Sequence, residues 1–435
     1  MAKEVLVVGA GFGGLEAART LAPGADVHVT VVDQRNHHLF QPLLYQVATA
    51  GLNPADIAVP IRAQFSRAPN VDVRLGRVAA VDLGRKRVSL EDGTELAWDF
   101  LVVAGGAQHS YFGHPEWEEF APGLKTLEQA TEIRRRLLSA FESAENEPDP
   151  AAQRRLLTFV IVGGGPTGVE LAGAIADISR TVLVRDFRRI DPASARVLLL
   201  EAGPRILPAF AEGLSRHAAE DLRALGVEVR TSAAVTGIDA HGVSIGGERI
   251  EAKSIFWAAG VQASSLSRSL GVELDRAGRV MVDADLSIPG HPDAFVIGDM
   301  AHLDEPERGL VPGLAPAAIQ EGKAAARNIL ASIAGRPRKP FRYRDKGMMA
   351  TIGKHRAIAQ TGPIRLTGYL AWLAWLFIHI LYLIGFTNRL LVVVQWAWSY
   401  VTRNRSARLI TGEREQPVVV VEPPRVESPS RAGGR

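Results

Sequence analysis

Short apolar runs alternate along the chain with longer stretches in which apolar residues recur at helical spacing. Four β-branched runs are bounded by glycine or an acidic residue: residues 5–8, 29–32, 159–162 and 197–200. Such runs are typical of parallel strands buried on both faces. The first and third are each followed by a glycine-rich turn and an Ala/Leu-rich stretch, which predicts an α/β fold. The two units lie about 150 residues apart, the scale of two domains.

The first glycine-rich turn, Gly9 to Gly14, has the spacing G-x-G-x-x-G. Its glycines permit a tight turn and a close approach of the backbone to a pyrophosphate, which the N–H groups of the following helix N-terminus can bind. Asp33 stands at the end of the next strand, where an acid accepts hydrogen bonds from ribose hydroxyls. Strand, turn, helix and acid together predict a Rossmann-like dinucleotide-binding domain rather than an ordinary strand-to-helix turn.

A second turn, Gly163 to Gly168, repeats this arrangement, and the strand after it ends in Glu201. An acid at this position favours the free 2′-hydroxyl of NADH over the 2′-phosphate of NADPH, although the nearby Arg205 can weaken that preference. Two fingerprints imply two dinucleotides. The simplest pair is a flavin that takes hydride from a nicotinamide.

Residues 296–301, Val-Ile-Gly-Asp-Met-Ala, supply a third signal. We interpret them as a buried strand that ends in Gly-Asp near the start of a helix. A carboxylate there can hold the ribityl hydroxyls of FAD while the helix end faces the flavin. Alone, Asp299 would be an ordinary strand-to-turn residue, but beside two fingerprints it is predicted to bind FAD.

Composition narrows the chemistry that the chain can perform. The chain has 435 residues, of which 47% are hydrophobic and 22% charged, so a globular protein of two or three domains is expected. It has no cysteine, which excludes disulfides, thiolate metal sites and dithiol redox chemistry. We predict no metal site, and electron transfer requires a bound cofactor.

The net charge of +3 hides an uneven distribution. Between Arg336 and Arg408, thirteen basic residues stand against the single acidic residue Asp345, so this region carries +12 and the rest of the chain −9. The same region holds four of the seven tryptophans. Basic residues and tryptophans beside long apolar runs indicate a surface that meets anionic lipid, whereas nucleic acid fits poorly as a partner.

Several segments resemble the flavoproteins with two dinucleotide-binding domains and, among them, the type II NADH:quinone oxidoreductases. They include FQPLLYQVA (40–48), EAGPRILP (201–208) and DKGMMATIG (345–353), together with residues 101–113, 164–173, 257–260, 315–322 and 385–389. The resemblance implies two Rossmann-like domains, for FAD and NADH, plus a C-terminal membrane-associating region. It also implies that hydride passes from NADH to FAD and two electrons then pass to a membrane quinone, without proton pumping.

The same resemblance implies the site residues. Those that hold FAD non-covalently are Gly9, Gly11, Gly13, Gly14, Asp33, Gln34, Val78, Gly105, Asp299, Ala317 and Ala318. Those that bind NADH are Gly163, Gly165, Thr167, Gly168, Glu201 and Gly260. Glu170 matches a family glutamate near the nicotinamide, with a glutamate stabilised by the helix dipole as the alternative. Gln320 is expected to line the quinone pocket, because an amide can hydrogen-bond a quinone oxygen in either redox state.

Two apolar segments lie in the basic C-terminal region. Residues 369–386 number eighteen, the threshold for a membrane-spanning helix, and residues 390–401 are too few to span. Scattered Trp and Tyr with flanking arginines favour helices that lie in the membrane interface over a span or a buried dimer core. His379 can lie near the quinone route or bond a partner within the anchor, and we favour the second interpretation.

These patterns predict the domain organisation. The expected segments are an FAD-binding domain in two parts (1–115 and 285–335), a connecting helix and loop (116–155, with the helix ending near Phe141 and the loop at 143–155), an NADH-binding domain (156–284), a membrane-anchoring region (336–412) and a disordered tail (413–435). We expect a peripheral protein on the cytoplasmic side of the cell membrane, and the resemblance suggests a homodimer. A soluble reductase of a rubredoxin or ferredoxin, and a flavin-binding redox sensor, are the alternative functions.

Overall fold

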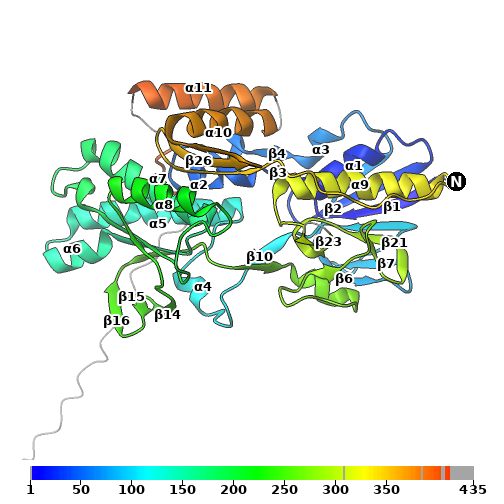
Figure 1. Cartoon of the computed structure of the whole chain (residues 1–435), viewed down its shortest axis with the longest axis horizontal. Helices are drawn as coiled ribbons and strands as arrows, with labels where there is room; N and C mark the ends of the chain where they lie inside the picture. Colours follow the sequence, from blue (N-terminus) through cyan, green and yellow to red (C-terminus); the bar gives the residue numbers. More distant parts are fainter. Residues whose placement is uncertain (1, 307–308, 384–385, 403–406, 412–435) are drawn as a thin grey trace, which may run out of the picture.

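The computed structural model describes residues 2–306, 309–383, 386–402 and 407–411, so the tail predicted at 413–435 lies outside the described residues. Two α/β halves lie side by side, and a smaller unit of strands and helices from the C-terminal region lies across them (Figure 1). The predicted α/β architecture is confirmed. The boundaries between the domains stay a prediction.

The half that contains the N-terminus is built on a six-stranded sheet with the order β20-β21-β9-β1-β2-β5. All neighbours run parallel except β20 and β21. The strands are β1 (Lys3–Val8), β2 (Val27–Asp33), β5 (Val71–Leu75), β9 (Phe100–Val103), β20 (Ser287–Ile288) and β21 (His291–Val296). Helices α1 (Phe12–Leu21) and α9 (Ala315–Ile333) share one buried cluster with this sheet. On the other face lie β6 (Val78–Asp82), β7 (Arg87–Leu90) and β8 (Glu95–Ala97).

The second half has a four-stranded parallel sheet with the order β13-β12-β11-β17. Its strands are β11 (Thr158–Val162), β12 (Arg196–Leu200), β13 (Val227–Arg230) and β17 (Ser254–Trp257). Helices α5 (Leu127–Asn146), α7 (Pro166–Thr181) and α8 (Glu212–Ala224) share a buried cluster with one face. The antiparallel strands β14 (Val235–Asp239), β15 (Gly242–Ile245) and β16 (Glu248–Glu251) cover the other face.

A short ribbon joins the two halves. It pairs β10 (Ala107–His109) antiparallel with β18 (Val261–Ala263), which directly follows the sheet of the second half. In Figure 1 this ribbon lies in the gap between the two halves. The carboxyl ends of both parallel sheets, where dinucleotides bind, are therefore connected by this ribbon.

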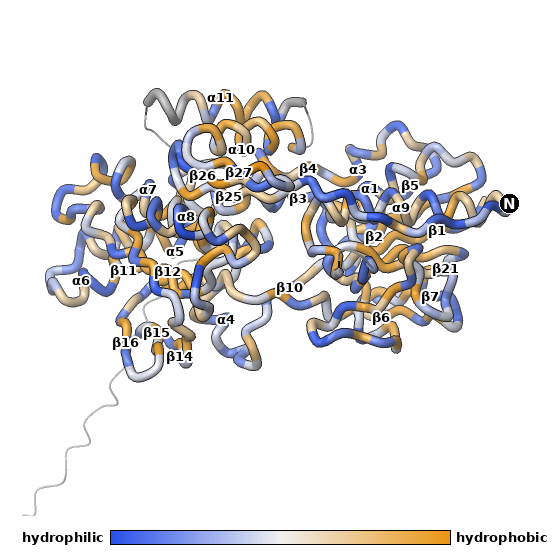
Figure 2. The backbone as a smooth tube through the Cα atoms, viewed as in Figure 1, coloured by the Kyte–Doolittle hydropathy of each residue, from blue (hydrophilic) through white to orange (hydrophobic). Residues whose placement is uncertain are grey.

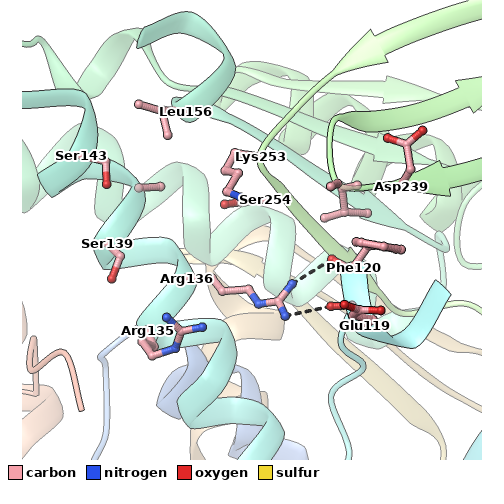
Figure 3. Close-up of a pocket in the computed structure, with 13 residues that line it drawn as sticks. Glu119, Phe120, Arg135, Arg136, Ser139, Ser143, Leu156, Asp239, Lys253 and Ser254 are labelled. Atoms are coloured by element: carbon pink, nitrogen blue, oxygen red, sulfur yellow. Dashed lines mark hydrogen bonds between the residues drawn. The ribbon is translucent and has the colours of Figure 1, made fainter. Parts of the chain in front are cut away.

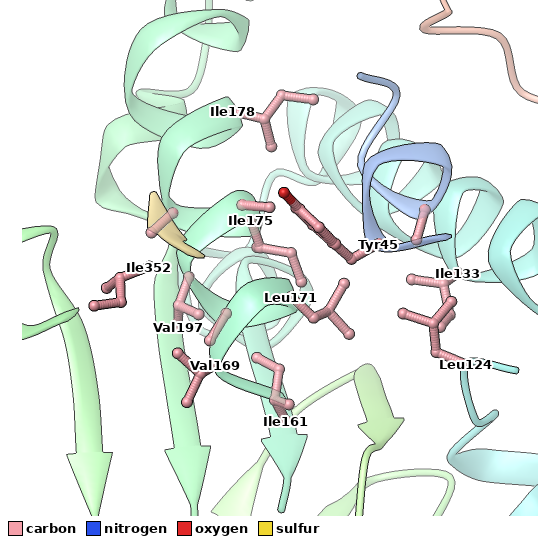
Figure 4. Close-up of a cluster of buried hydrophobic side chains, with 14 of the residues drawn as sticks. Tyr45, Leu124, Ile133, Ile161, Val169, Leu171, Ile175, Ile178, Val197 and Ile352 are labelled. Atoms are coloured by element: carbon pink, nitrogen blue, oxygen red, sulfur yellow. The ribbon is translucent and has the colours of Figure 1, made fainter. Parts of the chain in front are cut away.

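The C-terminal unit combines a three-stranded antiparallel sheet with two helices. The elements are β25 (Met348–Gly353), β26 (Arg356–Thr361), β27 (Ile364–Thr367), α10 (Gly368–Tyr382) and α11 (Phe386–Thr402). Ile352 of β25 belongs to one buried cluster with Ile175 and Ile178 of α7 and with Tyr45 of α2 (Leu44–Ala48), all of which Figure 4 draws. The unit is thus part of the hydrophobic core of the second half. Figure 2 shows that α10 is strongly hydrophobic.

The loop predicted from the sequence at 143–155 needs correction. Residues 143–155 are not a loop, because α5 continues to Asn146 and α6 occupies Pro150–Leu156. The proline stands at the first helical position, where its missing N–H costs nothing, and Asp149 caps the helix by accepting hydrogen bonds from Ala151 N and Ala152 N. The apolar run 369–386 is divided, since α10 ends at Tyr382. Among the described residues, no helix is both long enough and apolar enough to cross a membrane.

Candidate active site

The first glycine-rich turn has the geometry that a pyrophosphate needs. Gly9 has a φ of +95°, and a Cβ at Gly14 would lie 1.8 Å from the carbonyl oxygen of Gly9. Both positions therefore require glycine. A Cβ at Gly11 would meet no atom within 4 Å, which leaves the outer side of the turn open. Helix α1 begins directly after it, so its N-terminal N–H groups face this open side.

Asp33, at the end of β2, is joined to this turn. Its Oδ2 accepts a hydrogen bond from Ala10 N at 2.6 Å, and its Oδ1 accepts one from Arg35 N at 2.7 Å. Burial raises the pKa of Asp33 despite these two bonds. Gln34 follows it in an exposed position, and Val78 begins β6 in a partly buried one. A carboxylate fixed beside the turn fits the ribose of a dinucleotide.

The second turn repeats this geometry. Gly163 has a φ of +112°, a Cβ at Gly168 would lie 1.9 Å from the carbonyl oxygen of Gly163, and Gly165 faces open space. The acid again bonds to the turn, because Glu201 accepts hydrogen bonds from Gly164 N at 2.6 Å and from Gly203 N at 2.7 Å. Thr167 lies in the first turn of α7, and Gly260 follows β17 with a φ of +70°.

The sequence predicts that Arg205 can weaken the preference for NADH. Its guanidinium donates hydrogen bonds to the carbonyl oxygens of Phe210 at 2.8 Å and Pro208 at 2.7 Å. These bonds hold the side chain against its own loop rather than against the carboxylate of Glu201. Glu201 is therefore the charged side chain that is placed to meet a ribose at the carboxyl end of β12.

The third signal, residues 296–301, has a different local structure from the one expected. Residues Gly298–Met300 form a 3₁₀ turn, and the next long helix, α9, begins only at Ala315. Tertiary packing still brings them together, because Glu321 of α9 accepts a hydrogen bond from Gly298 N at 2.5 Å. Asp299 thus lies against the N-terminal half of α9, and Gly105 is nearby, because a Cβ at Gly105 would lie 2.8 Å from the Met300 sulfur.

The predicted FAD residues of α9 and α1 also meet. A Cβ at Gly13 would lie 3.1 Å from the carbonyl oxygen of Ala318, next to the buried Ala317. Small residues on both helices allow this close approach. The structure therefore brings the first turn, Asp33, Asp299 and the start of α9 to one edge of the sheet, as an extended dinucleotide such as FAD requires.

Glu170 lies on α7, two residues after the last glycine of the second turn. It is almost surrounded by protein, although part of its surface stays accessible. Among the described residues, Glu170 Oε1 accepts a long hydrogen bond from Thr351 N at 3.4 Å, and burial raises the pKa of Glu170 to about 8. A carboxyl of this kind is protonated at neutral pH and can donate a hydrogen bond.

Gln320 lies on α9 with its amide occupied by backbone groups. Its Nε2 donates hydrogen bonds to the carbonyl oxygens of Pro316 and Arg344, both at 3.0 Å, and its Oε1 accepts one from Arg344 N at 3.0 Å. Both N–H donors are therefore used. The amide can still accept a hydrogen bond at Oε1, but in this arrangement it has no free donor for a quinone carbonyl.

Three further residues belong to this site and were not singled out from the sequence. Thr351 contacts Glu170, Glu321 holds the turn that carries Asp299, and Lys125 is a partly buried cation near Asp299. Burial lowers the pKa of Lys125, and the carboxylate of Asp299 opposes that shift. Thr351 and Glu321 lie within the resemblance segments 345–353 and 315–322, but no spacing rule assigns them a role, because each of the three residues reaches the site from a distant part of the chain.

A separate pocket lies away from this site. Its lining residues include Glu119, Phe120, Arg135, Arg136, Asp239 and Lys253 (Figure 3). Arg136 donates hydrogen bonds to the carbonyl oxygens of Glu119 and Phe120. Strand β17 begins at this pocket, whereas dinucleotides bind at the carboxyl end of such strands. The pocket is therefore not the nicotinamide site.

Comparisons with known proteins agree with this geometry. Residues 3–322 match the family described as pyridine nucleotide-disulphide oxidoreductase. The chain is 45% identical over 426 residues to the type II NADH:quinone oxidoreductase Ndh of Mycobacterium tuberculosis, a match that covers 94% of this chain and 91% of that protein. It is also 45% identical over 427 residues to NdhA of the same organism, covering 94% and 90%.

A solved structure shows the same fold. It is that of NDH2 from Plasmodium falciparum in complex with NADH, which matches with a TM-score of 0.86 at 19% identity and covers 95% of this chain and 100% of that one. The absence of cysteine separates this chain from disulfide chemistry within the wider family. On these grounds the chain belongs to the pyridine nucleotide-disulphide oxidoreductase family and, within it, to the type II NADH:quinone oxidoreductases.

Proposed function

We propose that this chain oxidises NADH and reduces a membrane quinone through a non-covalently bound FAD, without pumping protons. The observation that carries the proposal is the pair of acid-capped glycine turns, one on each parallel sheet, with Glu170 beside the second. When bound, the flavin supplies the redox chemistry by taking a hydride and giving up two electrons. The naming of the two relatives at 45% identity supports the same activity.

The first half fits FAD. The open outer side of Gly11 admits the pyrophosphate, and Asp33 can hold the adenosine ribose. Asp299, backed by Glu321 and near Lys125, can hold the ribityl chain. The second half fits NADH in the same way through Gly165 and Glu201.

Glu170 is proposed as the residue that meets the nicotinamide. Since its carboxyl is protonated near neutral pH, it can donate a hydrogen bond to the carboxamide oxygen of the nicotinamide. Gln320 is proposed to border the quinone pocket. Its hydrogen bonds to the backbone of Arg344 fix the position of the segment that leads into the C-terminal unit.

The C-terminal helices are proposed to rest on the membrane. Large apolar side chains of α10 and α11 are exposed, including Leu370 (67%), Leu381 (50%) and Leu390 (54%). Because soluble monomers rarely expose such apolar patches, this surface supports a contact with lipid. The +12 charge of residues 336–408 complements anionic lipid. We propose peripheral attachment at the cytoplasmic face of the cell membrane and a homodimeric assembly.

The deciding experiment is anaerobic. The protein is purified in detergent, its flavin spectrum is recorded, NADH is added, and a short-chain quinone follows. We expect NADH to bleach the flavin and the quinone to restore it rapidly. Bleaching without recovery would contradict quinone reduction and point to a protein acceptor, such as a rubredoxin or ferredoxin. A flavin that NADH does not bleach would indicate a sensor without turnover.

A further inference from the structure

A row of aromatic rings connects the first turn to the C-terminal helices. Ring centroids lie 6.0 Å apart for Phe12 and Phe40, 6.2 Å for Phe40 and His379, 4.3 Å for His379 and Trp375, and 5.7 Å for Trp375 and Trp396. Phe12 is the first residue of α1, and the last three residues belong to α10 and α11. We call these five residues the aromatic row.

Burial and a hydrogen bond hold the aromatic row in place. Phe40 and Trp375 are each 3% exposed and belong to one buried hydrophobic cluster. Trp396 donates a hydrogen bond from Nε1 to Oε1 of Gln46 at 2.8 Å, which ties α11 to the segment that follows Phe40. The rings therefore form a fixed, mainly apolar surface that runs from the flavin-binding turn to helices α10 and α11.

His379 is the member of the row whose unpartnered ring nitrogen can accept a hydrogen bond. Trp375 Nε1 also has no partner among the described residues, but it is buried, and an indole N–H only donates. Nδ1 of His379 lies 2.7 Å from the carbonyl oxygen of Trp375, and since a carbonyl only accepts, Nδ1 carries the hydrogen. Burial lowers the pKa of His379 to about 4, so the ring is neutral and Nε2 holds a lone pair. Among the residues that the structure describes, no group bonds to this Nε2. The sequence interpretation of His379 as a bonded anchor residue thus accounts for one nitrogen only.

Neighbouring polar groups cannot take over this role. His38 also has a partnerless Nε2, but its side chain is 2% exposed and its Nδ1 contacts Ala10 O. Gln320 has both of its donors occupied. His379 is only partly buried, so its lone pair is the acceptor that a ligand lying on the row can reach.

We propose that the quinone headgroup lies against the aromatic row and that the hydroxyl of its reduced form donates a hydrogen bond to Nε2 of His379. This inference rests on the proposed function and names a residue for it. A quinone that becomes a quinol takes up two electrons and two protons. The hydride that NADH gives to the flavin accounts for both electrons and one proton, solvent supplies the second proton, and His379 supplies none of them. It accepts the O–H that appears during reduction, so it stabilises the reduced form and the transition state that leads to it more than the quinone.

Two substitutions distinguish the roles of the two ring nitrogens of His379. His379→Asn keeps an amide near the position of Nδ1 and removes the acceptor at Nε2, whereas His379→Gln places an amide oxygen near Nε2. We expect His379→Asn to lower kcat/KM for a short-chain quinone about tenfold, the loss of one hydrogen bond. His379→Gln should recover most of that loss. Flavin bleaching by NADH and turnover with ferricyanide should not change in either variant.

A matched control is His355→Asn. His355 also packs on a tryptophan of α10, with its ring centroid 4.9 Å from that of Trp372, but it lies outside the row. Its backbone φ of 65° is one that asparagine tolerates. We expect this variant to keep the quinone kinetics of the native chain.

The proposal is overturned if His379→Asn and His379→Gln behave alike, if His379→Asn slows the ferricyanide reaction as much as the quinone reaction, or if His355→Asn has the same effect. These outcomes differ from failure of the proposed function. In that case the native chain itself would not pass electrons to the short-chain quinone.

Discussion

The two glycine-rich turns of this chain have the same local structure and different surroundings. In each, the acid at the end of the next strand accepts a hydrogen bond of 2.6 Å from the turn, through Asp33 in the first and Glu201 in the second. The helices that follow are covered differently. Helix α1 is covered by α9 of the same half, whereas α7 is covered by β25 of the C-terminal unit.

Two glutamates at equivalent motif positions show how the element packed on each helix changes the environment of a side chain. Glu16 and Glu170 both stand two residues after the last glycine of their turns. Glu16 pairs with Arg19 at 3.8 Å and with Lys323 at 3.4 Å. Glu170 has no cation within ion-pair distance among the described residues, and burial raises its pKa to about 8. The glutamate at this motif position is therefore paired with two cations in one half, whereas in the other half burial without such a partner raises its pKa.

The close contacts of the two helices explain this difference. A Cβ at Gly322 of α9 would lie 2.2 Å from the carbonyl oxygen of Gly13, and a Cβ at Gly173 of α7 would lie 1.8 Å from that of Ile352. Both helices need glycine to admit their neighbour. Only α7 takes that neighbour from the unit proposed to contact the membrane, so NADH binding and membrane attachment share one core.

The largest effects are expected at the turns themselves. Gly14→Val and Gly168→Val each place side-chain atoms against a carbonyl oxygen that lies within 2 Å of the Cβ position. We expect Gly14→Val to be purified without flavin. Gly168→Val should keep the flavin spectrum but lose bleaching by NADH. Equal flavin content in the two variants would contradict the assignment of one turn to each dinucleotide.

Removal of the chain after Lys339 is expected to have the next largest effect. The first half keeps its own covering helix, so FAD should be retained. Quinone reduction and membrane retention should be lost, and the second half should become less stable, because α7 loses β25. Flavin content, vesicle flotation and quinone turnover measure these outcomes. Full activity in the soluble fraction would contradict the role of the C-terminal unit.

Glu201→Arg tests the acid of the second turn. We expect weaker discrimination against NADPH, with the ratio of kcat/KM for NADH to that for NADPH falling about 10- to 100-fold, as expected when a charged hydrogen bond to ribose is replaced by a cation that attracts phosphate. Glu201→Gln is the control, since it removes the charge without adding a cation. Unchanged selectivity in Glu201→Arg would remove Glu201 from the nicotinamide site.

The smallest effect concerns stability against pH. Because the folded pKa of Glu170 is raised from 4.5 to about 8, the folded state binds more protons than the unfolded state between these values. The free energy of unfolding should therefore fall as the pH rises from about 4.5 to about 8. We expect Glu170→Gln to flatten this fall in calorimetric melting experiments, while Glu16→Gln should leave it unchanged. A fall that persists in Glu170→Gln would place its origin elsewhere.

Much of the fold followed from local pattern. The strands at residues 5–8, 29–32, 159–162 and 197–200 are confirmed within β1, β2, β11 and β12. The loop predicted at 143–155 was wrong, because a capping aspartate followed by proline starts a helix as readily as it marks a turn. The candidate site was predictable where a motif is contiguous, and less so where distant segments meet.

The sequence by itself determined the two turns, because glycine spacing and a terminal acid are local requirements of backbone geometry. It also determined the family and the basic, apolar character of the C-terminal region. Only the tertiary structure decided the surroundings of these groups. Packing against β25 buries Glu170 and raises its pKa, and hydrogen bonds to Arg344 occupy Gln320. The hydrogen bond from Nδ1 of His379 to the carbonyl oxygen of Trp375 leaves Nε2 without a partner among the described residues. Burial and pairing depend on contacts between segments far apart in the chain, which no local pattern specifies.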